Sequence, residues 1–159
     1  MLLTNKAEAD PILGLSLIDE EAWPIAKSYV LPDKAAVMTM LAKGLSALVL
    51  QENESWLEIT YWHNDLEANQ DLFYGYRRGQ GDTRSLAEAS IYKCAQADAG
   101  ALSSILSLVL YFNWDARLLD LNRTYMIRIS HDGFIDLHST SEQFAKDAES
   151  EFELTGLIR

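Results

Sequence analysis

The amino-acid sequence predicts an α+β fold, with an antiparallel sheet built from two hairpins, packed against a buried central helix and flanked by further helices. Two segments rich in aromatic and β-branched residues are each broken by a short polar turn, which is typical of hairpins. Between them lies a segment that is apolar on most sides at helical spacing, which indicates a buried helix. The chain has 159 residues, of which 48% are hydrophobic and 23% charged, enough for one globular core. We therefore expect a single domain over 1–159, with an irregular segment over 1–31 and the α+β core over 32–159.

The first helix is expected to begin at Pro32 and Asp33, because proline suits the first helical turn and apolar residues then recur at helical spacing. Gly44 is expected to end it, since glycine readily takes the left-handed conformation that closes helices. Before this helix, proline and glycine interrupt the pattern, and only an alternation around Leu15–Leu17 is compatible with a short edge strand.

The first hairpin is expected to join Ala47–Leu50 to Trp56–Trp62 through the polar turn between them. Leu72–Arg78 has the composition of a third strand, and a glycine-rich loop follows it. Residues 83–97 fit a helix better than a strand, because their apolar stripe, which includes Cys94, has a helical period.

The second half of the chain has the clearest pattern. Asp98 is a suitable N-cap for the buried helix, which is expected to reach Phe112. A second hairpin is expected to join Trp114–Leu121 to Thr124–Ser130, and a further strand, Phe134–His138, follows a tight turn.

The last helix is predicted from a capping signal and from its apolar spacing. Ser139 and Glu142 have the separation of a capping box, which satisfies backbone donors at a helix start. Phe144, Ala148 and Phe152 then follow at intervals of four, so that one face of the helix is apolar.

The charge balance bears on the partners that this protein can bind. With 24 acidic and 13 basic side chains, the formal net charge is −11, which disfavours nucleic acids and acidic membranes and favours a basic protein partner. The longest apolar segment, Ala101–Phe112, is too short to cross a bilayer. The N-terminal residues lack the pattern of a secretory signal, and the single cysteine cannot form an internal disulfide. We therefore expect a cytoplasmic protein.

No motif for catalysis or cofactor binding is visible in the sequence, so we expect no cofactor and no enzymatic activity. No serine lies in a G-x-S-x-G turn, and the glycines of residues 75–81 follow no nucleotide-binding pattern. One cluster has the side-chain types of a metal site, and its members are His131, Asp132, Asp136 and His138. If a turn folded the first pair towards the second, this cluster would suit zinc, and a small metal-dependent hydrolase is the alternative function. Otherwise these residues form a tight turn and a solvated strand face.

The candidate partner-binding residues are acidic and aromatic. The acidic side chains fall in two groups, one expected in a loop and one in the last helix: Asp65, Glu67 and Asp71, then Asp147, Glu149 and Glu151. Aromatic residues that could anchor a partner lie near the first group: Tyr61, Trp62, Tyr74 and Tyr76. Charge complementarity and aromatic anchors are common in protein interfaces. A solvated surface that keeps the protein soluble is the alternative explanation of the acidic groups.

Two stretches of the C-terminal half, Phe112-Asn113-Trp114-Asp115 and Ser130-His131-Asp132-Gly133-Phe134-Ile135-Asp136-Leu137, resemble small bacterial immunity proteins of polymorphic or contact-delivered toxin systems. The resemblance implies a cytoplasmic inhibitor that binds its cognate toxin and covers its active site without doing chemistry itself. The acidic composition agrees with an inhibitor of a basic toxin, such as a nuclease. An adaptor with another basic partner remains a further alternative.

Overall fold

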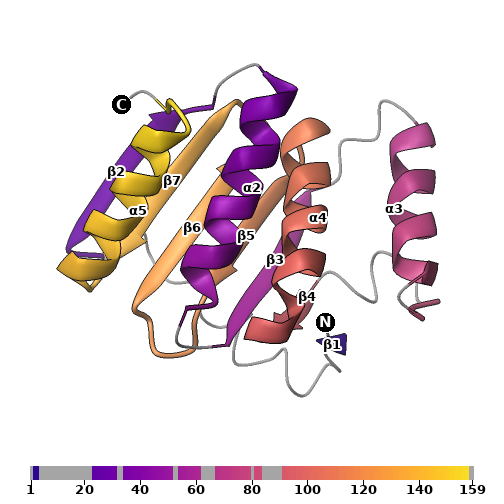
Figure 1. Ribbon diagram of the computed structural model, residues 1–159, viewed down its shortest axis with the longest axis horizontal. Helices are drawn as coiled ribbons and strands as arrows, with labels where there is room; N and C mark the ends of the chain where they lie inside the picture. The colour runs from indigo at the N-terminus through magenta and orange to yellow at the C-terminus, as the bar shows by residue number, and fades with distance from the viewer. Residues whose placement is uncertain are drawn as a thin grey trace.

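The computed structural model describes residues 2–3, 23–31, 34–51, 54–61, 67–79, 81–83 and 91–157; for residues 2–3, 67–70 and 73 it describes the backbone alone. This part of the chain forms one antiparallel sheet with helices packed on one of its faces (Figure 1). The predicted α+β class and the antiparallel sheet are therefore confirmed.

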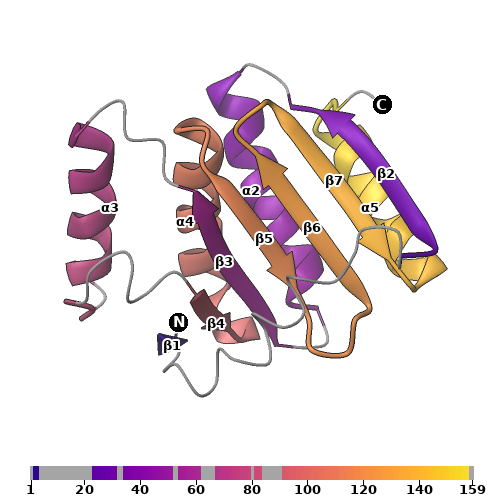
Figure 2. The ribbon, with the colours of Figure 1, turned by 180° about the vertical axis from the view of Figure 1, so that it is seen from behind.

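The sheet has seven strands in the order β1-β4-β3-β5-β6-β7-β2, and every neighbouring pair is antiparallel. In chain order, these strands are β1 (Leu2–Leu3), β2 (Ile25–Val30), β3 (Ser55–Tyr61), β4 (Ile91–Cys94), β5 (Asp115–Leu119), β6 (Tyr125–Ser130) and β7 (Phe134–Ser139). Strands β5, β6 and β7 follow one another as a meander. Strand β2, which comes much earlier in the chain, pairs with β7 and forms the edge of the sheet opposite β1. Figure 2 shows the face of the sheet that is turned away from the helices.

Three helices cover the other face side by side, with α5 over the β7 and β2 edge, α2 in the middle and α4 beyond it (Figures 1 and 2). The described helices are α2 (Ala35–Val49), α3 (Glu67–Gly79), the short 3-10 helix η2 (Gln96–Asp98), α4 (Ala99–Tyr111) and α5 (Glu142–Leu154). Helix α3 lies outside this layer, past α4.

The core lies between the helical layer and the sheet. Alternate residues of the central strands, such as Leu118, Ile127 and Leu137, are fully buried there against the apolar sides of α2 and α4. This alternation follows from the two-residue period of a strand. Truncation of one such side chain to alanine typically costs about 2–5 kcal/mol, so these residues define the fold rather than any binding site.

The predicted second half is largely confirmed. The buried helix is α4, and the hairpin around residues 122–123 is β5 and β6, followed by β7. The turn before β7 has Gly133 at φ 83°, a conformation that favours glycine. The last helix is also present, but its N-cap is Ser141, whose hydroxyl accepts from the backbone N–H of Phe144, and not Ser139.

The predicted first hairpin is wrong, because α2 continues past Gly44 to Val49 and includes most of the segment Ala47–Leu50 that was expected as a strand. Leu41, Leu45 and Leu48 share one buried side across the glycine, and this apolar stripe keeps the helix intact. Gly44 has a different role: a Cβ there would lie 1.8 Å from Glu151 Oε1 of α5. The glycine thus allows the Glu151 side chain to lie across α2.

Three further predictions of the first half are wrong. Leu72–Arg78 belongs to helix α3, residues 91–94 form strand β4 rather than a helix, and residues 25–30 of the expected irregular segment form β2. For the two strands, pairing with distant segments decides the structure: β4 pairs with β3, and β2 pairs with β7. The expected strand at Leu15–Leu17 lies outside the described residues.

Candidate partner-binding groove

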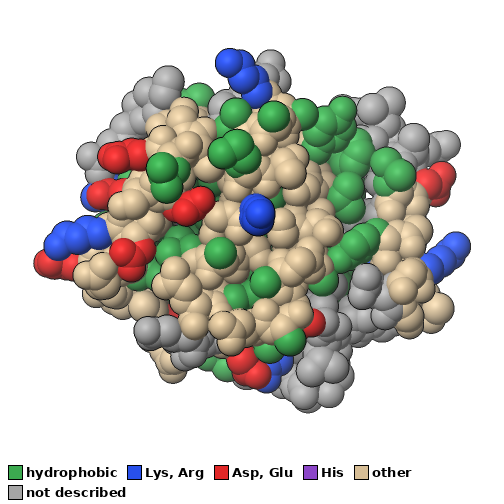
Figure 3. All heavy atoms as spheres, viewed as in Figure 1, with side chains coloured by type: hydrophobic (Ala, Val, Ile, Leu, Met, Phe, Trp, Pro, Cys, Tyr) green, Lys and Arg blue, Asp and Glu red, His purple; other side chains and the backbone are tan. Residues whose placement is uncertain are grey.

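Helix α5 carries the second predicted acidic group and packs its apolar side on the core. Ala145, Ala148 and Phe152 are buried, with Phe152 in edge contact with Tyr29 of β2 at 4.8 Å between ring centroids. Because these residues recur at helical spacing, the acidic side chains between them lie at the two flanks of the helix and on its outer side, and Figure 3 shows Asp and Glu side chains gathered over α5.

The three predicted acidic residues of α5 have different surroundings. Asp147 is exposed and accepts a hydrogen bond of 2.9 Å from Gln143 Nε2, one turn earlier. Glu149 lies on the β2 flank, where it pairs with Lys27 and accepts from the Tyr29 hydroxyl at 3.3 Å. Glu151 lies on the opposite flank, against Gly44 of α2. The structure therefore does not place all three on one surface.

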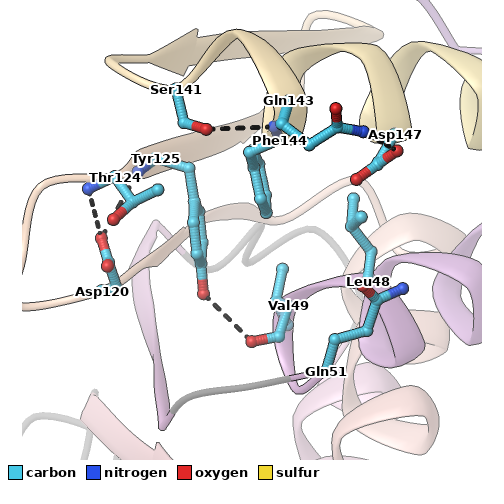
Figure 4. A pocket seen from close by; sticks show the side chains of 10 residues that line it. All are labelled: Leu48, Val49, Gln51, Asp120, Thr124, Tyr125, Ser141, Gln143, Phe144 and Asp147. Carbon is cyan, nitrogen blue, oxygen red and sulfur yellow. Dashed lines mark hydrogen bonds between the residues drawn. The ribbon is translucent and has the colours of Figure 1, made fainter.

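A groove runs between α2 and α5, and we call it the α2/α5 groove. One of its hollows, about 260 Å³, lies where the end of α2, the β5–β6 turn and the start of α5 meet (Figure 4). A second hollow of about 300 Å³ follows along α5 and shares Leu48, Gln51 and Asp147 with the first. Three carboxylates line the groove, from Asp120, Asp147 and Glu151, and none of the described lining residues is basic.

The hollow on the β2 flank of α5 has a different charge. It measures about 350 Å³, and its described lining includes two lysines, Lys27 and Lys146, beside two glutamates, Glu142 and Glu149. The two flanks of the same helix are thus electrostatically unlike, and only the α2/α5 groove is acidic without lining cations among the described residues.

Asp120 is the most deeply placed carboxylate of the groove, with a side chain that is 2% exposed. It follows β5, and its Oδ1 accepts from the backbone N–H groups of Thr124 at 2.7 Å and Tyr125 at 3.3 Å. These bonds fix the β5–β6 turn, in which Arg123 takes a left-handed conformation with φ 58°. Its other oxygen, Oδ2, is buried and receives no hydrogen bond from any described residue.

Sequence reasoning missed Asp120 because the residue lay inside a segment assigned to a strand. The available signal was its position just before Asn122 and Arg123, since aspartate often accepts from backbone N–H groups of the turn that follows it.

Two aromatic rings form one wall of the same hollow. Tyr125 and Phe144 are stacked, with centroids 4.2 Å apart and ring planes 7° from parallel, and both rings extend into the middle of the site in Figure 4. The Tyr125 hydroxyl donates towards Ser55 Oγ at 2.9 Å. Burial raises the pKa of Tyr125 well above its usual range, so the phenol is neutral and adds no charge to the groove.

The first predicted group is not beside α5. Trp62 and Asp65 lie outside the described residues, and for Glu67 only the backbone, at the start of α3, is described. Asp71 is exposed on α3, a helix that Figures 1 and 2 place at the opposite end of the helical layer from α5. Asp71, the member of the first group whose side chain is described, therefore lies on a different surface from the acidic residues of α5.

The predicted aromatic anchors are also dispersed. Tyr74 is half-buried on α3 with Arg78 above its ring, and Tyr76 is half-buried and donates to the Ala101 carbonyl at 3.0 Å. Tyr61 ends β3, where its ring contacts that of His131 at 5.2 Å between centroids. Tyr76 thus attaches α3 to α4, which is a structural role.

The structure does not bring the four candidate metal ligands together. His131 is bonded through Nδ1 to Asp115 at 2.8 Å, and its Nε2 lies 3.5 Å from Asp132. The hydrogen bond to Asp115 raises the pKa of His131 above its usual value. At the other end of β7, His138 is only 5% exposed beside Trp23, so the predicted solvated position for it is wrong.

Asp136 lies between the two histidines along β7 and has its own partners. It accepts from Ser28 Oγ at 2.6 Å and faces Arg128 at 4.0 Å. Within the described residues, no group of three or more histidine, cysteine, aspartate or glutamate side chains is placed to hold a metal ion.

The comparisons with known proteins assign no family: no family model matches the chain, and no curated protein or solved structure matches it either. None of the described helices is long and apolar enough to cross a membrane. The described residues define an α+β fold, in which three helices cover one face of an antiparallel sheet.

Proposed function

We propose that this is a non-enzymatic binding protein that docks a basic protein through the α2/α5 groove and the exposed outer side of α5. The observation that carries the proposal is the groove itself, lined by three carboxylates and by no basic side chain among the described residues, in a chain of net charge −11. A cleft lined by one sign of charge concentrates the field and attracts an oppositely charged partner.

The partner class that we propose is a toxin domain, with the protein acting as a cytoplasmic immunity protein that covers a basic active-site surface. The general likeness of residues 112–115 and 130–137 to immunity proteins supports this choice, together with the acidic groove. The same charge disfavours nucleic acid as a ligand. A basic partner without toxin activity would make the protein an adaptor instead.

The test compares two charge reversals of equal size. Tagged wild type, Asp147→Lys and Asp71→Lys are used to capture partners from the native host at moderate salt, with quantification by mass spectrometry, and the captured partner is then titrated as a purified protein. Both aspartates are exposed, but only Asp147 lines the groove.

We expect one dominant basic partner whose affinity falls at least about tenfold in Asp147→Lys and stays within about twofold in Asp71→Lys, since reversal of a contacting charge costs more than 1.4 kcal/mol. Equal affinities for all three proteins would contradict the groove as the docking site. Loss in Asp71→Lys alone would move the site to α3. Inhibition of the partner's activity by wild type would support the immunity function.

A further inference from the structure

We infer that the hollow at the start of α5 receives an arginine side chain of the partner protein. This inference rests on the proposed function, and it adds the chemistry of the group that is bound. The site is the first hollow of the α2/α5 groove, and Figure 4 shows Asp120 on one side of the stacked Tyr125 and Phe144 rings and Asp147 on the other.

The size of the hollow suits one side chain. Its volume of about 260 Å³ lies just below the range of roughly 300–1,000 Å³ that is usual for pockets of drug-sized ligands. One long side chain that projects from the surface of another protein can fill such a space. The ring systems of a cofactor are not needed to fill it.

The buried oxygen of Asp120 specifies a donor. A buried carboxylate oxygen that accepts no hydrogen bond carries a desolvation cost, which a donor from a ligand would remove. Among the described residues, Asp120 Oδ2 is in this position, because the backbone N–H groups of Thr124 and Tyr125 both donate to Oδ1. Asp147, whose Oδ1 accepts from Gln143, lines the same hollow and supplies a second negative charge.

The arrangement favours a guanidinium group over an ammonium group. A guanidinium is a planar fork with five donors that matches the geometry of a carboxylate, and its weak hydration makes burial cheaper than for an ammonium. Its flat face also stacks on aromatic rings, and the half-buried Phe144 lines the hollow, while Leu48 and Val49 provide apolar contacts for the side-chain stem.

The experiment uses the whole protein and small probes, so it does not depend on finding the partner. Nα-acetylarginine amide is titrated into ¹⁵N-labelled protein at low salt, and chemical-shift changes of the backbone amides are followed. Nα-acetylcitrulline amide is the neutral control of the same shape, and Nα-acetyllysine amide is the ammonium control. Free L-arginine tests whether the natural ligand is an amino acid rather than a side chain.

We expect saturable binding of the arginine amide, with shifts concentrated at residues 120–125 and 141–147. The citrulline amide should bind at least about tenfold more weakly, because it lacks the positive charge that strengthens hydrogen bonds to a carboxylate. The lysine amide should bind about threefold more weakly or worse. Asp147→Asn should weaken the arginine amide by about fivefold or more, and the matched variant Asp71→Asn should leave it unchanged.

Several results would overturn the inference: equal binding of the citrulline amide, equal binding of the lysine amide, tighter binding of free L-arginine, or shifts outside the hollow. The two proposals fail separately. If the arginine amide does not bind while partner affinity still depends on Asp147, the hollow is not an arginine site and the docking function stands. If the amide binds but partner affinity is unchanged in Asp147→Lys, the hollow binds a guanidinium, the docking face is elsewhere, and the inference that the partner supplies the arginine is wrong.

Discussion

Asp120 offers the sharpest test of how the groove is held, through a comparison of Asp120→Ala with Asp120→Asn. The alanine variant removes the acceptor for two backbone N–H groups of the β5–β6 turn, one at 2.7 Å and one at 3.3 Å. A buried donor left without its partner costs about 1–3 kcal/mol. The second bond is longer and weaker, so we expect a total loss of about 2–4 kcal/mol in the free energy of unfolding.

The asparagine variant keeps an oxygen in the position of Oδ1 and exchanges the other buried oxygen for an amide nitrogen. We therefore expect a loss below about 1 kcal/mol, with the turn intact. In a domain of this size 1 kcal/mol corresponds to roughly 2–4 °C in Tm, so the alanine variant should melt about 4–16 °C lower and the asparagine variant within about 4 °C of wild type.

Urea unfolding followed by Trp fluorescence measures both losses, and circular dichroism gives the Tm values. Equal destabilisation by alanine and asparagine would refute the role of Oδ1 as the acceptor that fixes the turn. A loss below about 1 kcal/mol in Asp120→Ala would refute it as well. If the asparagine variant is as stable as expected, it becomes the cleanest probe of the hollow, because it removes the charge and keeps the turn.

Three further predictions concern the pKa of His131, the reactivity of Cys94 and the contact at Gly44. Asp115→Asn should lower the pKa of His131 in an NMR titration, and an unchanged titration would contradict the hydrogen bond as the cause of the raised pKa. The variant should also be less stable than wild type, with the full difference below about pH 6.5. This difference should disappear as the pH rises through the raised pKa of His131 in the folded state. Burial raises the pKa of Cys94 to about 12, so the thiol should not react with a disulfide reagent near pH 8 until the protein unfolds, and rapid reaction of the native protein would contradict its burial. Gly44→Ala should change stability by less than about 1 kcal/mol, because alanine improves helix propensity while Glu151 must turn away. The same variant should lower the affinity for the partner. An unchanged affinity would show that Glu151 is not part of the docking surface.

The second half of the fold could be predicted from the sequence because its signals are local. Apolar residues at helical spacing define α4, and the alternation on either side of a short turn defines β5 and β6. The first half depends on contacts between distant segments. Gly44 is a strong local signal for a helix end, but the leucine stripe of α2 meets the core on both sides of it, and burial outweighs the cost of a glycine inside a helix, which is only about 1 kcal/mol.

The candidate site was also predicted only in part, because its geometry depends on contacts between distant segments. The acidic residues of the last helix are visible in the sequence, but whether they act together depends on which flank each one occupies and on what faces it. Glu149 lies beside Lys27 of β2, a strand that the sequence did not predict, so its pairing could not be foreseen. Glu151 lies against Gly44 of α2, and this contact depends on how the two helices pack, which no local sequence signal gives.

The unequal flanks of α5 determine where the acidic field of this protein acts. On the β2 flank, two lysines offset two glutamates, so their fields largely cancel at the distance of an approaching protein. On the α2 flank the three carboxylates have no lining cation among the described residues, and the walls of the groove limit screening by water. A basic partner should therefore associate faster at low salt, and its association rate should fall steeply as salt rises. The same salt dependence should be weaker in Asp147→Asn and unchanged in Glu142→Gln, because Glu142 lines the balanced flank. An equal change in both variants would show that net charge, rather than the groove, guides the partner.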